Sequence, residues 1–177
     1  MMVIRTLLAL VFVFQSIFAV AGPISDTFSD SVFGVKWTDD VETVKRKFPG
    51  GKIKDNAGIS VYEVKDGREV LKTRRAKKDK ITFTFDAVGK LNGIGIEFPY
   101  EGIESFSSLL NKMTTYFGTY DNDDENTSEF GMNIVWPTDN HITLTLAIVP
   151  KILGGFDIIM GIGRVVPVEA SKNELGF

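Results

Sequence analysis

The sequence contains no cysteine and a single histidine, His141, in 177 residues. Disulfide bonds, cysteine nucleophiles and thiolate metal sites are therefore excluded, and so is any site that needs two histidines. Neither sign of charge dominates, since 20 basic and 23 acidic residues leave a formal net charge of −3. A weakly acidic chain is not typical of nucleic-acid-binding proteins, so we expect no nucleic-acid partner. The 44% hydrophobic content indicates a globular chain, not a disordered one.

The first residues have the pattern of a secretory signal peptide. Arg5 supplies a positive charge, an apolar run covers 7–14, and a small-x-small cleavage pattern ends at Ala21. The run is much shorter than the roughly 20 apolar residues of a membrane-spanning helix. We therefore predict a signal peptide over 1–21, cleaved near Ala21, followed by a single exported domain over 22–177.

The missing cysteines also bear on the compartment. Exported eukaryotic domains of this size usually carry disulfides, whereas this chain has none. The composition therefore favours a bacterial protein that is periplasmic or secreted. No later apolar run is long enough to cross a bilayer, so we expect no transmembrane segment after cleavage.

Two segments have the periodicity of amphipathic helices. The first begins after Asp39, a residue type that caps helices, and ends before Pro-Gly-Gly at 49–51. The second covers 103–117, with apolar residues at helical spacing, and ends at Gly118. These two segments are the helices that we predict.

Alternation of apolar and polar residues predicts that most of the remaining chain is strand. Asp66-Gly67 has the composition of a two-residue hairpin turn between the first two strands. The sequence thus predicts an α+β fold, in which a bent antiparallel sheet of about seven strands carries both helices on one face. The predicted strands cover 59–65, 68–74, 80–86, 91–98, 130–136, 142–148 and 156–162.

The order of these elements leaves open two similar halves, 33–98 and 99–164. Each half begins with a helix that ends at Phe-Pro-Gly or Phe-Gly, and each contains a Gly-Ile-Gly strand. Helices often end at glycine, so an ancient duplication and a coincidence both fit this pattern.

Two segments are similar to parts of known domains. The stretch Phe33-Gly34-Val35-Lys36-Trp37, with the helix that follows it to Gly50, resembles the opening of several small exported bacterial domains. The stretch from Ile81 to Gly118 resembles their middle section. These domains are mostly of unassigned function, so the resemblance implies an exported α+β module and carries over no catalytic residue.

Two charged clusters are candidate contact surfaces. The basic cluster suits an acidic protein or an anionic component of the envelope, or it is an exposed hairpin end kept soluble by its charge. The acidic cluster suits a basic partner, an irregular Ca²⁺ site or a solvated loop. The residues concerned are Arg74, Arg75, Lys77 and Lys78 in the basic segment and Asp121, Asp123 and Asp124 in the acidic loop.

Other residues with chemical potential are few. Trp37 and Trp136 fit either a binding interface, where tryptophan is enriched, or the core. No serine lies in a nucleophile-elbow pattern that could serve His141, which we expect in a turn or at the surface. Glu97 and Asp157 stay open as a carboxylate pair for glycoside hydrolysis.

The strand faces opposite the apolar residues are rich in threonine and glycine. Such a face is flat and able to hydrogen-bond, so it suits a protein or an extended ligand, or it is simply the solvent side of the sheet. It carries Thr82, Thr84, Gly93, Gly95, Asn133, Thr143, Thr145 and Gly161.

Taken together, these features favour a non-enzymatic exported binding or accessory module that contacts an envelope protein or a secreted toxin. Few of its side chains can do chemistry at neutral pH, so an enzyme is less favoured, and we expect no cofactor or metal. The alternatives are a carboxylate-based hydrolase of envelope glycans and a carrier that encloses a hydrophobic ligand behind the bent sheet.

Overall fold

The computed structural model describes residues 24–56, 59–121, 127–128, 131–151 and 154–165. The predicted signal peptide and the acidic residues Asp123 and Asp124 lie outside these ranges. Within them, no helix has the length and apolar character needed to cross a membrane.

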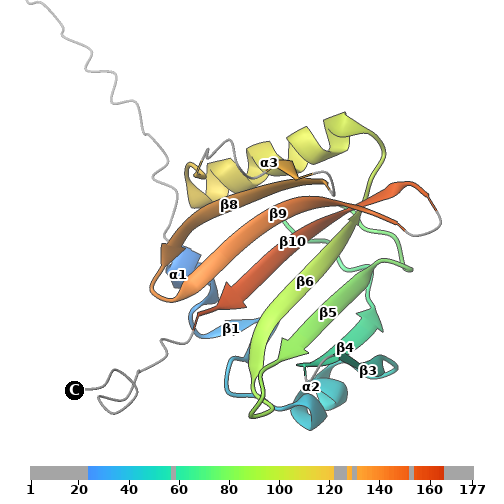
Figure 1. The fold of residues 1–177 in the computed structure, drawn as a ribbon, viewed down its shortest axis with the longest axis vertical. Helices are drawn as coiled ribbons and strands as arrows, with labels where there is room; N and C mark the ends of the chain where they lie inside the picture. The colour runs from blue at the N-terminus through green and yellow to red at the C-terminus, as the bar shows by residue number, and fades with distance from the viewer. Residues whose placement is uncertain (1–23, 57–58, 122–126, 129–130, 152–153, 166–177) are drawn as a thin grey trace, which may run out of the picture.

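One antiparallel sheet organises the fold, with the strand order β3-β4-β5-β6-β10-β9-β8-β7. Figure 1 shows the longer strands curving across the molecule. The predicted antiparallel α+β architecture is therefore confirmed, with two strands that were not predicted, β3 at one edge and the two-residue β7 at the other. The strands are β3 (Lys52–Asn56), β4 (Ile59–Lys65), β5 (Lys80–Phe85), β6 (Leu91–Pro99), β7 (Thr127–Ser128), β8 (Gly131–Asp139), β9 (Ile142–Pro150) and β10 (Phe156–Arg164).

The helices all pack on one face of this sheet. They are α1 (Ile24–Phe28), α2 (Val41–Lys47) and α3 (Ile103–Phe117), and a separate hairpin of β1 (Ser31–Val32) and β2 (Val35–Lys36) lies between the first two in sequence. Their buried side chains belong to the same core cluster as the inward-facing residues of the strands. We call the other side of the sheet the open face. Figure 1 looks onto this face, with α1 and β1 behind the strands.

The bounds of α2 and α3 agree closely with the two predicted helices, with one shift at α2, whereas α1 was not predicted. Its N-cap is Asp40 and not Asp39, because the Asp40 carboxylate accepts a hydrogen bond from the Thr43 N–H at 2.8 Å. Asp39 instead accepts a hydrogen bond from the Lys47 ammonium at 2.7 Å and so braces the last turn of the same helix. The predicted bounds of α3 are confirmed, although Ile103 at its start is exposed.

The hairpin predicted at Asp66-Gly67 is wrong. β4 pairs with β5, and residues 68–74 form no strand. Residues 66–79 are instead a loop, closed where the Asp66 N–H donates to the Asp79 carbonyl at 2.9 Å. Gly67 lies so close to the other side of this loop that a Cβ would stand 2.7 Å from the Ala76 carbonyl oxygen. The close approach requires glycine here, but not as a hairpin turn.

The two halves of the chain meet at the centre of the sheet. Each half supplies a helix followed by four strands, and the last strands of the halves, β6 and β10, pair with each other. This pairing sets Gly93 opposite Gly163 and Gly95 opposite Gly161, so the two Gly-Ile-Gly segments are in direct register.

Candidate functional site

Two parallel rows of small residues cross the open face of the four central strands β5, β6, β10 and β9. Within each row the residues are direct cross-strand partners, and two glycines are flanked by two threonines. One row is Thr82, Gly95, Gly161 and Thr145, and the other is Thr84, Gly93, Gly163 and Thr143. We call these eight residues the threonine-glycine groove.

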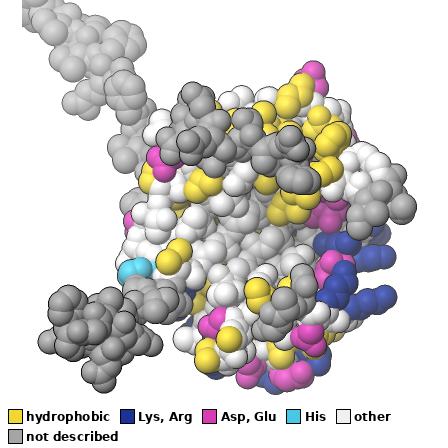
Figure 2. All heavy atoms as spheres, viewed as in Figure 1, with side chains coloured by type: hydrophobic (Ala, Val, Ile, Leu, Met, Phe, Trp, Pro, Cys, Tyr) yellow, Lys and Arg dark blue, Asp and Glu magenta, His cyan; other side chains and the backbone are white. Residues whose placement is uncertain are grey.

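The glycines leave a hollow of about 450 Å³ over the middle of the sheet. It is lined by all eight groove residues, and Glu97 and Ile159 lie at one end as the next cross-strand pair. In Figure 2 the centre of this face is white, because threonine and glycine carry no coloured groups, while hydrophobic and charged side chains lie around it. The hollow therefore has a polar but uncharged floor inside a mixed rim.

Folding alone does not explain most of these glycines. A Cβ at Gly93 or Gly95 would stand 3.5 or 3.7 Å from its nearest neighbours, which is ordinary van der Waals contact, and at Gly163 the distance would be 3.9 Å. Only at Gly161 would it crowd another atom, the Thr145 hydroxyl. Glycine in a strand interior costs about 0.5–1 kcal/mol relative to alanine. The hollow thus carries a stability cost that the packing does not require.

Glu97 gives the groove its one ionisable side chain among the described lining residues. Burial raises the pKa of the Glu97 carboxyl, and the nearby Asp157 carboxylate raises it further. The two acids do lie on one face of paired strands, but Asp157 is ion-paired with Lys151 and is not part of the lining. Glycoside hydrolysis needs two carboxylates that flank the substrate, so the arrangement suits hydrogen bonding better than hydrolysis.

The charged rim beside the groove contains more basic than acidic side chains. Glu63 on β4 accepts salt bridges from Lys54 on β3 and Lys80 on β5, both at 3.2 Å. In Figure 2 the dark blue and magenta side chains stand together on the side where these strands lie. Exposed pairs of this kind contribute little to stability, and the Glu63 carboxylate balances the charge of only one of the two lysines.

The basic segment does not form one exposed patch. Arg74, Lys77 and Lys78 are exposed, as expected, but Arg75 is only 5% exposed. Its Nε donates to the Glu97 carbonyl and its Nη2 to the Lys80 carbonyl, both at 2.6 Å. Burial lowers the pKa of the Arg75 guanidinium. The expected exposure of Arg75 is therefore wrong, because its charge holds the 66–79 loop against β5 and β6.

Both tryptophans are core residues. Trp37 is 3% exposed and Trp136 is fully buried. The Trp37 indole N–H donates to the Phe28 carbonyl at 2.7 Å, and that of Trp136 donates to the Gly118 carbonyl at 2.9 Å. Of the two locations that the sequence left open, the core is confirmed, and neither side chain is free to contact a partner.

The remaining sequence candidates lie away from the groove. Asp121 is exposed beside β8, where its N–H donates to the Val135 carbonyl at 2.9 Å. The described residues contain no group of three or more histidine or acidic side chains that could hold a metal ion. His141 is exposed in the β8–β9 turn, as expected. Asn133 is exposed on β8, beyond the groove lining.

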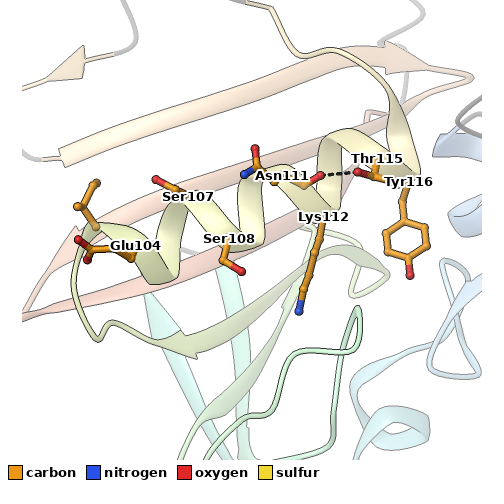
Figure 3. Close-up of a pocket in the computed structure, with 8 residues that line it drawn as sticks. Glu104, Ser107, Ser108, Asn111, Lys112, Thr115 and Tyr116 are labelled. Atoms are coloured by element: carbon orange, nitrogen blue, oxygen red, sulfur yellow. Dashed lines mark hydrogen bonds between the residues drawn. The ribbon is translucent and has the colours of Figure 1, made fainter.

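A hollow along the outside of α3, of about 630 Å³, is an open helix surface and not a site. All of its lining residues come from this one helix. Figure 3 shows Ser107 and Asn111 on one side of the helix and Lys112 on the other, with no common centre. Lys112 reaches the 66–79 loop, where its ammonium donates to the Lys72 carbonyl at 3.0 Å and to the Thr73 hydroxyl at 2.8 Å.

Sequence alternation identified most of the groove but missed Gly163 and Ile159, and it named Glu97 only as a possible carboxylate partner of Asp157. The second glycine of Gly161-Ile162-Gly163 was a visible signal, since residues two apart on a strand share a face.

Comparison of the chain with protein-family models, curated proteins and solved structures finds no match.

Proposed function

We propose that this chain is a non-enzymatic exported binding module whose threonine-glycine groove receives an extended segment of a protein partner. The partner is an envelope protein or a secreted protein such as a toxin. The observation that carries the proposal is the hollow over Gly93, Gly95 and Gly163, where a Cβ would fit and would stabilise the strands.

The openness of the groove favours a protein over a small molecule. Sites for small ligands bury roughly 70–90% of the ligand surface. Here the sheet supplies only a floor and low threonine walls, so a small ligand would keep its outer side in water. A protein segment brings its own cover, because the rest of the partner closes over the groove and extends the interface across the rim.

The chemistry of the groove indicates what it would recognise. Backbone groups of β6 and β10 are already paired with their neighbours, so the partner does not add a strand. Thr82, Thr84, Thr143 and Thr145 can each donate and accept a hydrogen bond, while the glycines allow a partner's main chain to come close. Glu97 at one end suits a lysine, arginine or amide side chain of the partner.

Export is supported by the sequence pattern over 1–21 and by the absence of cysteine from the whole chain. A partner in the envelope or the medium follows from that compartment. Measuring the mass of the protein purified from its native source tests this part of the proposal, since cleavage near Ala21 removes the leader.

The groove itself is tested by site-specific photo-crosslinking. A benzophenone amino acid placed at Thr84 or at Thr143 is expected to give one adduct of defined mass with the envelope or medium fraction. The same group at Ser107, exposed on the outside of α3, is the matched control and is expected to give none. Adding Gly95→Leu to the groove-labelled proteins is expected to abolish the adduct.

Equal adducts from all three positions would overturn the proposal. So would an adduct that survives Gly95→Leu, because the side chain would then fill the groove without displacing the partner. Turnover of an envelope glycan that is abolished by Glu97→Gln would instead establish the hydrolase alternative.

A further inference from the structure

A second cavity, apolar and separate from the groove, lies on the covered side of the same central strands. It measures about 240 Å³ and opens between the sheet, the segment 27–33 and the 66–79 loop. Its apolar walls include Val32, Phe33, Leu71, Ile96 and Met160. Thr27 and Ser31 are the only polar residues among its described lining.

The lining and size of the cavity define a narrow class of ligand. In the described part of the chain, no buried polar side-chain atom lacks a hydrogen-bond partner, so nothing there calls for an ordered water. A dry apolar cavity of about 150 Å³ takes up benzene or xenon, and drug-sized ligands occupy roughly 300–1,000 Å³. A cavity of about 240 Å³ lies between these and fits one small aromatic or branched aliphatic molecule without charge.

Two residues that line the cavity, Phe33 and Leu71, lie in turns and have an unfavourable backbone conformation. Phe33 (φ 54°) and Gly34 (φ 76°) form the centre of the β1–β2 turn. Leu71 (φ 50°) and Lys72 (φ 52°) form the centre of a second two-residue turn inside the 66–79 loop. Positive φ at both central positions favours asparagine, aspartate or glycine, since a bulky side chain crowds the backbone there.

A third turn of the same kind provides an internal comparison. Asn140 (φ 45°) and His141 (φ 69°) connect β8 and β9, and the first position carries the favoured asparagine. This turn does not line the cavity, whereas Phe33 and Leu71 both do. Strained backbone of this type is concentrated at ligand clamps and other functional positions.

We propose that the cavity binds a small, uncharged, apolar molecule and that Phe33 and Leu71 clamp it against Ile96 and Met160. Phenylalanine and leucine occupy their strained turn positions because their side chains form the outer wall of this site. The site is independent of the groove, because it uses the opposite face of β6 and β10.

Toluene is the probe, and methyl-detected NMR of the whole protein is the measurement. The methyl signals of Ile96, Met160 and Ile162, which all line the cavity, are expected to shift saturably as toluene is added. The methyl signals of Ile53, exposed at the β3 edge, are the internal control and are expected to stay in place. The melting temperature is expected to rise with toluene concentration, since the ligand binds the folded state.

Leu71→Asn separates a clamp from ordinary packing. It replaces the strained wall by the residue type that the turn favours, so we expect toluene affinity to fall at least tenfold. Asn140→Gly is the matched control, because it changes an equivalent turn away from the cavity and is expected to leave toluene affinity unchanged.

Three unmoved cavity methyl signals at saturating toluene would overturn the proposal, and this result does not depend on any variant. Unchanged toluene affinity in folded Leu71→Asn would overturn the clamp. Should Leu71→Asn fail to fold, the titration of the unaltered protein decides whether the cavity binds.

Discussion

Strands β5, β6, β10 and β9 build two unlike faces from alternate residues. Toward the helices they present side chains such as Phe83, Leu144 and Met160, which are at most 1% exposed. Toward solvent they present the threonine-glycine groove, where three of the four glycines have room for a Cβ. Burial explains the covered face, whereas the packing does not require glycine at Gly93, Gly95 or Gly163. The comparison indicates that substitutions on these strands can separate stability from binding.

The largest expected effect is on the covered face. Phe83 is fully buried, and its ring centroid lies 4.9 Å from that of Phe48 and 6.4 Å from that of Tyr62. Phe83→Ala is expected to lower the free energy of unfolding by about 3–5 kcal/mol. Thr84→Ala, on the next residue and the open face, is expected to change it by less than about 0.5 kcal/mol. Urea denaturation measures both, and similar losses would break the distinction between the faces.

The second largest effect on stability is expected in the 66–79 loop, where a buried arginine and an exposed arginine are neighbours in sequence. Arg75→Met is expected to cost about 3 kcal/mol, because the Glu97 and Lys80 carbonyls lose their charged donor in a buried setting. Arg74→Met, at the exposed neighbouring residue, is expected to stay within about 0.5 kcal/mol of the parent. Thermal and urea unfolding of the two variants check this, and an equal cost would contradict the structural role of Arg75.

The third effect concerns the glycines. Gly95→Ala is expected to raise the free energy of unfolding by about 0.5–1 kcal/mol, since the Cβ meets only ordinary contacts at 3.7 Å. Gly67→Ala is the contrasting variant and is expected to lose about 1–3 kcal/mol, because its Cβ would stand 2.7 Å from a backbone oxygen. Destabilisation by Gly95→Ala, measured by urea denaturation, would give the groove glycines a role in folding.

The smallest effect depends on pH. The folded-state pKa of Glu97 is raised above its ordinary value of 4.5, so stability is lost as the pH rises through the folded pKa. Glu97→Gln has no such loss. Its advantage over the parent is expected to be near zero in acid and to grow to about 0.5 kcal/mol or less at neutral pH, since the side chain is partly exposed to solvent.

Asp66→Asn is the control, because the pKa of Asp66 is shifted in the opposite direction to that of Glu97. The hydrogen bond from Arg68 lowers the pKa of Asp66, so its stabilisation is present at neutral pH and is lost as the pH falls through the folded pKa. Asp66→Asn is therefore expected to be less stable than the parent at neutral pH and equal to it in strong acid. Unfolding curves over this pH range check both variants, and parallel behaviour would contradict the two directions.

Much of the fold could be predicted from local pattern. Residues 103–117 carry apolar side chains at helical spacing and end at Gly118, and α3 has these bounds. Strict alternation of apolar and polar residues identified β5, β6, β9 and β10, because each of these strands has one buried face and one face nearer the solvent. Strand β3 gave no such signal, because an edge strand at Lys52–Asn56 buries little and its residues are mostly polar.

The sequence predictions failed where contacts between residues far apart in the chain decide the structure. Residues 68–74 alternate like a strand, but the guanidinium of Arg75 finds an acceptor at Glu97, on a strand that follows much later. The groove was visible as threonine and glycine on alternate positions, yet its two continuous rows depend on the register between β6 and β10. Pairing between distant segments is not encoded in the local period, so neither the rows nor the position of Glu97 at their end could be derived.

The central claim is that the threonine-glycine groove of the open face binds the protein partner and that the covered face takes no part in this contact. Its most direct test is the affinity of the crosslinked partner for Gly95→Leu, beside Ser107→Leu on the outside of α3. The account predicts that both variants keep the stability of the parent within about 1 kcal/mol and that only Gly95→Leu loses affinity, by tenfold or more, which is about 1.4 kcal/mol. Equal affinity of the two variants for the partner would contradict it.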